Sequence, residues 1–309
     1  MEPRPDSTTP RAVVYFAATR PPFLLAAAVP VALGLAAVAA DGAAVYAVRA
    51  LATAIGAVLA LAGANILNDY YDAESGTDEI NTGRIFPFTG GSRFIQNKVI
   101  AKENMLKFGL ALLAATAAIG LALTAVAGVG LVGIGVLGLV IAWGYTAPPL
   151  NLAARGLGEA AVAASFGLLI PVGTYYAQTS GWSTSPLVIG TPYALLVSNL
   201  LVINMFPDAK ADAAVGKRTS VVRLGPARAS YLYVGSTSAA LCWLWATMPE
   251  EMGATGQMLA GLPLALSLRA GLDVVAFADE PSKLARAIPL TIAAALLHGT
   301  LYAVALVWF

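Results

Sequence analysis

The chain has 309 residues, of which 58% are hydrophobic and 11% are charged, and its formal net charge is +1. A soluble domain has about 25% charged residues, so this composition excludes a disordered chain, an ordinary soluble enzyme and a nucleic-acid binder that depends on a basic surface. It favours an all-α polytopic membrane protein in contact with the lipid bilayer. The single cysteine, Cys242, excludes an internal disulfide.

Nine apolar stretches follow one another along the chain, each close to the roughly 20 residues that a helix needs to cross a bilayer. Residues 1–19 contain prolines and charges without an apolar core, so they predict a cytoplasmic N-terminal segment and not a cleavable signal peptide. No linker divides the remainder, so residues 20–309 are expected to form a single nine-helix domain. The predicted spans are 21–40, 44–67, 106–126, 128–147, 158–178, 187–207, 229–248, 256–277 and 285–307.

The eighth stretch is interrupted by Arg269 and Asp273, which a helix places on one face. Either this span ends near Leu268, or the pair faces a cavity. The last stretch contains His298, which is far in sequence from the other polar motifs and is expected to be a buried bundle residue and not a catalytic base.

The distribution of positive charge predicts the orientation. All lysines and arginines except Arg49 and Arg269 fall in the N-terminal segment or in the loops after the second, fourth, sixth and eighth spans. Loops rich in Lys and Arg stay in the cytoplasm. The pattern therefore predicts a multi-pass protein of an inner or plasma membrane, with its N-terminus and these loops on the cytoplasmic side.

The first of two charged loops covers about 68–105 and begins where the second span ends, in the run NILNDYYDAESGTD. Residues three, four or seven positions apart share one face of a helix. Asn65, Asp69 and Asp72 therefore form one polar stripe, with Asn68 beside it.

The second charged loop covers about 204–228 and begins with NMFPDAKAD, where the sixth span ends. If the helix continues past Pro207, then Asn204, Asp208 and Asp212 are successive i, i+4 positions. Both stripes thus consist of an amide one turn inside the helix, followed by two carboxylates.

Carboxylates at these positions need positive charge, because the C-terminal end of a helix is itself partly negative and an aspartate at membrane depth is costly. Oxygen ligands in this arrangement suit Mg²⁺, which typically binds one or two carboxylates and substrate phosphate. The alternative without a binding function is that both charged runs are simply solvated ends of helices on the cytoplasmic side. A cation-coupled transporter is a further alternative, but it predicts acidic residues near the middle of the membrane. Here both stripes approach from one side, which indicates a one-sided site.

At these residues the chain resembles the UbiA-type intramembrane prenyltransferases. Asn68, Asp69 and Asp72 match the first aspartate motif of that family, and the longer form NDYYDxxxGTD, with Asp78 last, looks like the branch that prenylates 1,4-dihydroxy-2-naphthoate in menaquinone synthesis. The second motif, with Asp208 and Asp212, departs in having Pro207 where many members have Arg. Four further segments are similar to the family: TRPP (19–22), PFTGGSR (87–93), YTAPPLNLAARGLGE (145–159) and GKRTSVVRLG (216–225).

The resemblance implies a bundle of nine transmembrane helices with an intramembrane cavity that opens to a cytoplasmic cap. It implies that Mg²⁺ bridges a polyprenyl diphosphate to catalytic aspartates of both motifs, and that the amide of Asn68 also binds metal while Asp78 supports the site. The metal ligands would be Asn68, Asp69, Asp72, Asp208 and Asp212, and the other candidate substrate-binding residues are Asp78, Arg20, Arg93, Lys98, Asn204, Lys217, Arg218 and Tyr145. The basic residues would contact the diphosphate, although positive-inside topology alone also explains them. Tyr145 would stabilise an allylic cation through its ring.

The implied reaction is Mg²⁺-dependent transfer of a polyprenyl group from its diphosphate to an aromatic acceptor, 1,4-dihydroxy-2-naphthoate, in quinone biosynthesis. A terpene cyclase of the same fold, or a prenyltransferase for another acceptor, fits the same motifs. Nothing in the sequence indicates an obligate protein partner.

Overall fold

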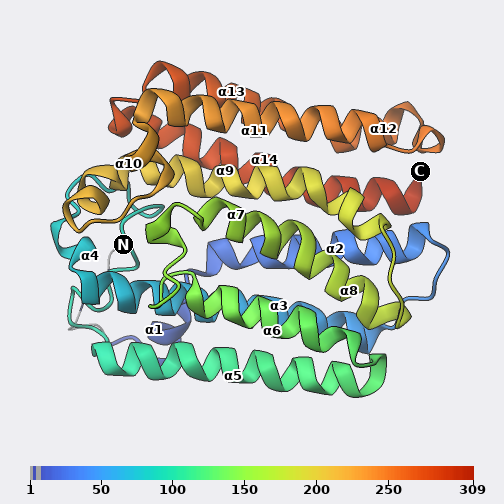
Figure 1. Cartoon of the computed structure of the whole chain (residues 1–309), viewed down its shortest axis with the longest axis horizontal. Coiled ribbons are helices and arrows are strands. Elements are labelled where there is room, and N and C mark those ends of the chain that lie inside the picture. Colours follow the sequence, from blue (N-terminus) through green and yellow to red (C-terminus); the bar gives the residue numbers. More distant parts are fainter. Residues whose placement is uncertain (1–2, 5–7) are drawn as a thin grey trace.

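The computed structural model describes residues 3–4 and 8–309, and every regular element in this part of the chain is helical (Figure 1). Of the predicted N-terminal segment 1–19, residues 1–2 and 5–7 lie outside the described residues. Among the described residues, seven helical segments are long and apolar enough to cross a membrane, as in a multi-pass membrane protein. They are α2 (Pro21–Ala40), α3 (Ala47–Ser75), α5 (Lys102–Ala127), α7 to α8 (Gly158–Thr179), α9 (Ser185–Ala214), η3 to α13 (Glu250–Ala276) and η4 to α14 (Pro281–Trp308).

The two remaining predicted spans coincide with helices that are not among these seven. The predicted span 128–147 corresponds to α6 (Gly130–Gly144), whose 15 residues are fewer than the about 20 of a typical span. The predicted span 229–248 corresponds to α11 (Pro226–Thr247). Short helices connect the long ones: α1 (Arg11–Ala18), α4 (Thr77–Ile80), η1 (Ala153–Arg155) and α10 (Ser220–Leu224).

Two of the seven segments are interrupted. A π-helical stretch, η2 (Ala164–Leu169), separates α7 (Gly158–Ala163) from α8 (Ile170–Thr179). The eighth predicted span consists of η3 (Glu250–Met252), α12 (Gly253–Gly261) and α13 (Leu264–Ala276).

The polar pair of the eighth span lies within a continuous helix. Arg269 Nη1 lies 2.6 Å from Asp273 Oδ1, so the two residues share a helix face as predicted. Because α13 continues to Ala276, the helix does not end near Leu268. Neither residue of the pair lines the cavity described below.

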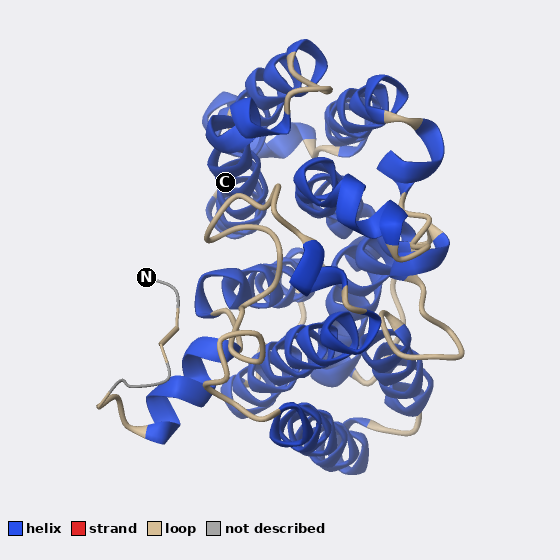
Figure 2. Cartoon of the chain, turned by 90° about the vertical axis from the view of Figure 1, so that its left-hand side faces the viewer, coloured by secondary structure: helices blue, strands red, loops and turns tan. Residues whose placement is uncertain are grey.

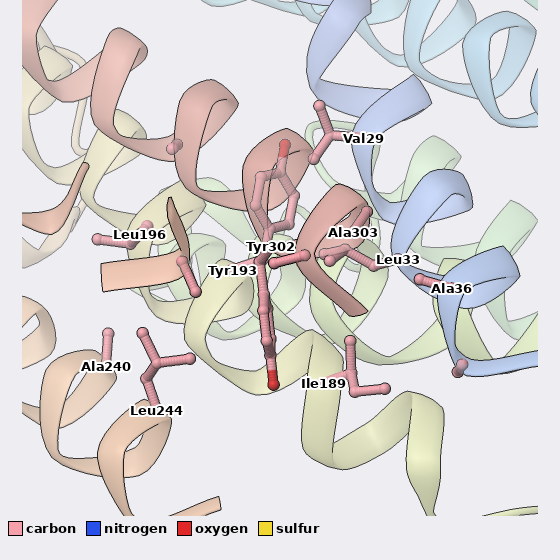
Figure 3. Close-up of a cluster of buried hydrophobic side chains, with 14 of the residues drawn as sticks. Val29, Leu33, Ala36, Ile189, Tyr193, Leu196, Ala240, Leu244, Tyr302 and Ala303 are labelled. Carbon is pink, nitrogen blue, oxygen red and sulfur yellow. The ribbon is translucent and has the colours of Figure 1, made fainter. Parts of the chain in front are cut away.

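The largest core cluster joins α2, α9, α11 and α14. Figure 3 shows Tyr193 of α9 and Tyr302 of α14 between these helices, with Leu33 and Leu244 beside them. The Tyr193 hydroxyl donates to the carbonyl oxygen of Ala26 at 2.9 Å, which ties α9 to α2. The predicted burial of His298 is confirmed, since this residue is fully buried, with its ring stacked on Tyr302.

The aspartate-bearing ends of α3 and α9 lie at the same end of the bundle, which we call the aspartate end. It is on the left in Figure 1, and it faces the viewer in Figure 2, where loops and short helices lie among the helix ends. At the opposite end, the Asp41 carboxylate accepts hydrogen bonds from Tyr175, Ser183 and Ser185. These bonds tie the end of α2 to α8 and to the start of α9.

Candidate active site

The first aspartate of α3 is enclosed by donors from other segments. Asp69 is 1% exposed, and its carboxylate accepts hydrogen bonds from the Arg20 guanidinium and from the hydroxyl and the N–H of Ser92. Arg20 directly precedes α2, and Ser92 belongs to the loop after α4. Asp69 is therefore held by one residue at the start of α2 and by another in the loop after α4.

A lysine joins the two aspartate motifs. Lys217 Nζ lies 2.6 Å from Asp72 Oδ1, at the end of α3, and 3.6 Å from Asp212 Oδ1, at the end of α9. Asn68 Nδ2 donates to the other oxygen of Asp72 at 3.1 Å. Burial opposes the charge of Lys217, but the carboxylates of Asp72 and Asp212 outweigh it and raise the lysine pKa. The two motifs thus lie on either side of one lysine.

The helix α9 continues through Pro207 to Ala214. Asn204, Asp208 and Asp212 are therefore successive i, i+4 positions of one helix, as the sequence predicted for a helix that continues past Pro207. Asp208 accepts a 2.6 Å hydrogen bond from Asn81 Nδ2, and it also contacts the Thr89 hydroxyl and a backbone N–H. Asn204, one turn earlier, has a buried side-chain oxygen that has no hydrogen-bond partner in the described chain.

Asp78 lies in α4, close to the first motif, and is 2% exposed. Gln96 Nε2 donates to its carboxylate at 3.2 Å, and Arg93 contacts its backbone carbonyl oxygen. Burial raises the pKa of Asp78 to about 8, and the negative charges of Asp72 and Asp69 add to this effect. Further positive charge in this region would therefore favour the ionised carboxylate.

A cavity of about 610 Å³ leads away from these groups into the bundle. Its polar end is lined by Arg20, Asn68, Tyr145 and Asn204. The remaining wall is formed mainly by small and aliphatic side chains of α3, α5, α6, η2 and α9, and it extends as far as Thr124 near the other end of α5. The shape and lining suit a long apolar chain with a polar head at the aspartate end.

The oxygen atoms of this site fit Mg²⁺. Four aspartates from two helices, together with the amides of Asn68 and Asn204, provide the hard ligands that this ion prefers. In the described residues, no three carboxylate, histidine or cysteine side chains converge on one point. Lys217 lies between Asp72 and Asp212 instead, and Arg20 contacts Asp69.

Two predicted contact residues do not reach this cluster. Lys98 is exposed on the loop after α4, in a left-handed backbone conformation with φ of 58°. Arg218 is exposed and lines a separate hollow with two other arginines. The remaining predicted residues contact the aspartates, line the cavity or, like Arg93 and Asp78, lie beside the first motif.

Sequence reasoning missed three polar residues around the site: Asn81, Ser92 and Glu159. Glu159 begins α7 and has a buried side-chain oxygen without a hydrogen-bond partner in the described chain. A Cβ atom on the preceding Gly158 would lie 3.5 Å from the Tyr145 hydroxyl, so this turn packs against the polar end of the cavity. Ser92 lies in the segment PFTGGSR and Glu159 in the segment YTAPPLNLAARGLGE. The similarity of these two segments to the family was the sequence signal that could have identified both residues.

The chain matches the model of the UbiA prenyltransferase family over residues 27–296. It is 31% identical to a 1,4-dihydroxy-2-naphthoate octaprenyltransferase of Mycobacterium tuberculosis over 72% of this chain and 73% of the relative. A protein of the same name from Haemophilus influenzae is 32% identical, with 71% of each chain covered. The structure of a UbiA homolog from Archaeoglobus fulgidus bound to DMAPP and Mg²⁺ superimposes with a TM-score of 0.62 at 19% identity, covering 95% of this chain and 98% of that one.

Proposed function

Because the chain belongs to the UbiA prenyltransferase family, we propose that it transfers a polyprenyl group from its diphosphate to 1,4-dihydroxy-2-naphthoate in quinone biosynthesis. The observation that supports this most directly is the contact of both aspartate motifs with Lys217 at the end of a long apolar cavity. A diphosphate at the aspartates would leave its polyprenyl tail in that cavity. The naphthoate relatives that cover most of the chain support the acceptor.

The proposed architecture has nine membrane spans, the seven long apolar segments together with α6 and α11. In it, residues 1–19 form a cytoplasmic segment and residues 20–309 form one domain in an inner or plasma membrane. The aspartate end faces the cytoplasm, where loops around the site form a cap over the cavity. The positive residues of the connecting loops support this orientation.

The proposed metal ligands are Asp69, Asp72, Asp208 and Asp212, with Asn68 beside them and Asp78 in support. Mg²⁺, when bound, supplies positive charge that offsets the negative charge of the diphosphate leaving group. Arg20 and Lys217 contact these aspartates in the structure, and in the proposed complex they contact diphosphate oxygens. Arg93, Lys98 and Arg218 stay candidate diphosphate contacts, and Asn204 stays a candidate orienting group for Asp208.

In the proposed reaction, the allylic C–O bond of the donor breaks and its electron pair leaves with the diphosphate. An electron-rich ring carbon of the acceptor then forms a C–C bond with the allylic carbon, and the ring loses a proton. Tyr145 lies at the polar end of the cavity, where its ring faces the developing cation. The apolar wall beyond it limits capture of the cation by water.

The test is an assay of the purified full chain in detergent. Mg²⁺, polyprenyl diphosphates of several lengths and a panel of aromatic acceptors are added, and the products are identified by mass spectrometry. We expect prenylated naphthoate and stoichiometric diphosphate, with no product when EDTA replaces Mg²⁺. A cyclic hydrocarbon formed without an acceptor would select a terpene cyclase, and a different prenylated ring would select another acceptor. Folded protein that releases no diphosphate with any pair would contradict the enzyme proposal.

A further inference from the structure

A second hollow, of about 720 Å³, lies at the aspartate end and shares no lining residue with the cavity. Arg155, Arg218 and Arg223 line it, and no carboxylate does. Its walls come from the segment before α7, which includes η1, and from the segment that leads from the end of α9 into α10. Three positive side chains therefore surround one polar space that is separate from the apolar cavity.

Backbone contacts hold the two walls of this hollow together. The N–H of Arg218 donates to the carbonyl oxygen of Ala154 at 2.7 Å. Arg155 Nη2 donates to the Pro149 carbonyl oxygen at 2.7 Å, and Arg223 Nη1 donates to that of Arg155 at 3.4 Å. These carbonyl acceptors hold the guanidinium groups of Arg155 and Arg223 without neutralising them.

The charge of the three arginines is not balanced within the described chain. None of them forms an ion pair with an aspartate or a glutamate there. Like charges around one space repel each other, and a bound anion removes that repulsion. The planar fork of arginine matches the oxygens of phosphate in a bidentate manner.

We propose that this arginine hollow binds a phosphate oxyanion. Its chemistry fits the head group of an anionic phospholipid and also free phosphate or diphosphate. Leu157 and Leu224, next to Gly156 and Arg223 in the chain, are 48% and 44% exposed. Exposed leucines beside uncompensated arginines are typical of a surface at the level of lipid head groups.

The hollow and the proposed active site share one wall, the segment Gly216–Lys217–Arg218. Gly216 and Arg218 line the hollow, whereas Lys217 between them points the other way, to Asp72 and Asp212. An oxyanion bound to Arg218 is therefore held directly behind the lysine that joins the two aspartate motifs.

The experiment uses the full chain in EDTA, where the carboxylates of the aspartate site repel anions. In the first arm, phosphate and diphosphate are titrated in a neutral detergent, with chloride at matched ionic strength, and the melting temperature is followed. In the second arm, nanodiscs of phosphatidylcholine are compared with nanodiscs that also contain phosphatidylglycerol. The variants are Arg218→Gln and Arg223→Gln, which remove one guanidinium group each from the hollow. Arg228→Gln, an exposed arginine at the start of α11 outside the hollow, is the matched control.

We expect the anion to raise the melting temperature of the wild-type protein, with a half-saturating concentration that increases about fivefold or more in Arg218→Gln and Arg223→Gln but not in Arg228→Gln. A response only to the soluble anions identifies free phosphate as the ligand, and a response only to phosphatidylglycerol identifies a head group. Equal responses of the wild type and all three variants in both arms would overturn the proposal. No turnover is measured, and Arg223 has no part in the proposed prenyl transfer, so the response of Arg223→Gln is independent of that proposal.

Discussion

At the scale of single residues, the four aspartates of the site differ in what balances their charge. Asp69 contacts Arg20, and Lys217 serves both Asp72 and Asp212. Asp208 accepts hydrogen bonds from neutral donors, among them the Asn81 amide and the Thr89 hydroxyl. The proposed metal would supply positive charge beside Asp208, where these donors are neutral.

The proposed metal site predicts how two variants behave. Asp72→Asn and Asp208→Asn should both lower turnover by at least about 100-fold, because each removes a proposed metal ligand. Asp208→Asn should also reduce the rise in melting temperature that Mg²⁺ and a prenyl diphosphate cause in the wild type. Turnover and melting curves with and without Mg²⁺ test this. Asp279→Asn, at an exposed position outside the site, is the control. Wild-type turnover in both site variants would show that the metal ligands are misplaced.

Lys217→Gln should destabilise the metal-free protein. The variant leaves Asp72 and Asp212 without their shared cation, and both side chains are largely buried. We expect the melting temperature in EDTA to fall by at least about 3 °C, which corresponds to roughly 2 kcal/mol in a chain of this size. Lys210→Gln, on an exposed position of α9, is the matched control. Equal melting temperatures for the two variants would contradict the bridging role.

At the scale of helices, α2 and α8 approach closely at Gly34. A Cβ there would lie 2.7 Å from the Pro171 carbonyl oxygen and 2.7 Å from the Thr174 Cβ. We expect Gly34→Ala to lower the free energy of unfolding by about 1–3 kcal/mol through overpacking, although Ala is the better helix former. Gly235→Ala, in α11 with no atom near its Cβ position, should be neutral or slightly stabilising. Denaturation in detergent compares the two, and a Gly34→Ala protein as stable as the control would refute the close approach.

The junction of α2 with α8 and α9 should respond to pH through Asp41. Partial burial opposes ionisation of this carboxyl, but hydrogen bonds from Ser185, Tyr175 and Ser183 outweigh it and lower its pKa. Because folding lowers the pKa of Asp41, its ionised carboxylate stabilises the folded protein at pH values above the unfolded-state pKa of about 3.9. This stabilisation is lost as the pH falls through the folded-state pKa. Asp41→Asn should therefore melt earlier than wild type at pH 7, with a gap that narrows below about pH 4. Melting curves from pH 3 to pH 7 test this, and a gap independent of pH would contradict it.

At the scale of the whole molecule, the length of the cavity predicts donor selectivity. Thr124 lines its far end, opposite the aspartates. Thr124→Phe should lower kcat/KM for long polyprenyl diphosphates by about tenfold and leave short donors within about twofold, because only a long tail reaches that point. Val126→Phe, which is on the same helix but 57% exposed, is the control. An equal loss for all donor lengths would show that the tail takes another path.

Much of this arrangement could be predicted from the sequence, because a helix in lipid must satisfy its backbone within one long apolar run. The aspartate stripes were also predictable, since helical spacing decides which residues share a face. Asn81 and Ser92 were not, because they lie in irregular loops whose contacts depend on the final packing. The helix α1 was missed for a similar reason, since eight residues are too few for a clear periodic signal.

The passage of α9 through Pro207 affects the wall of the cavity. Proline has no N–H, so the carbonyl oxygen of Ile203, four residues earlier, loses its helical donor. The side-chain oxygen of the adjacent Asn204 also lacks a donor in the described chain. A buried acceptor without a donor is costly, and Asn204 lines the cavity, so a phenolic O–H in the cavity is the kind of group that would satisfy its oxygen. This part of the bundle would thus distinguish a hydroxylated ring from a plain hydrocarbon before any bond is broken.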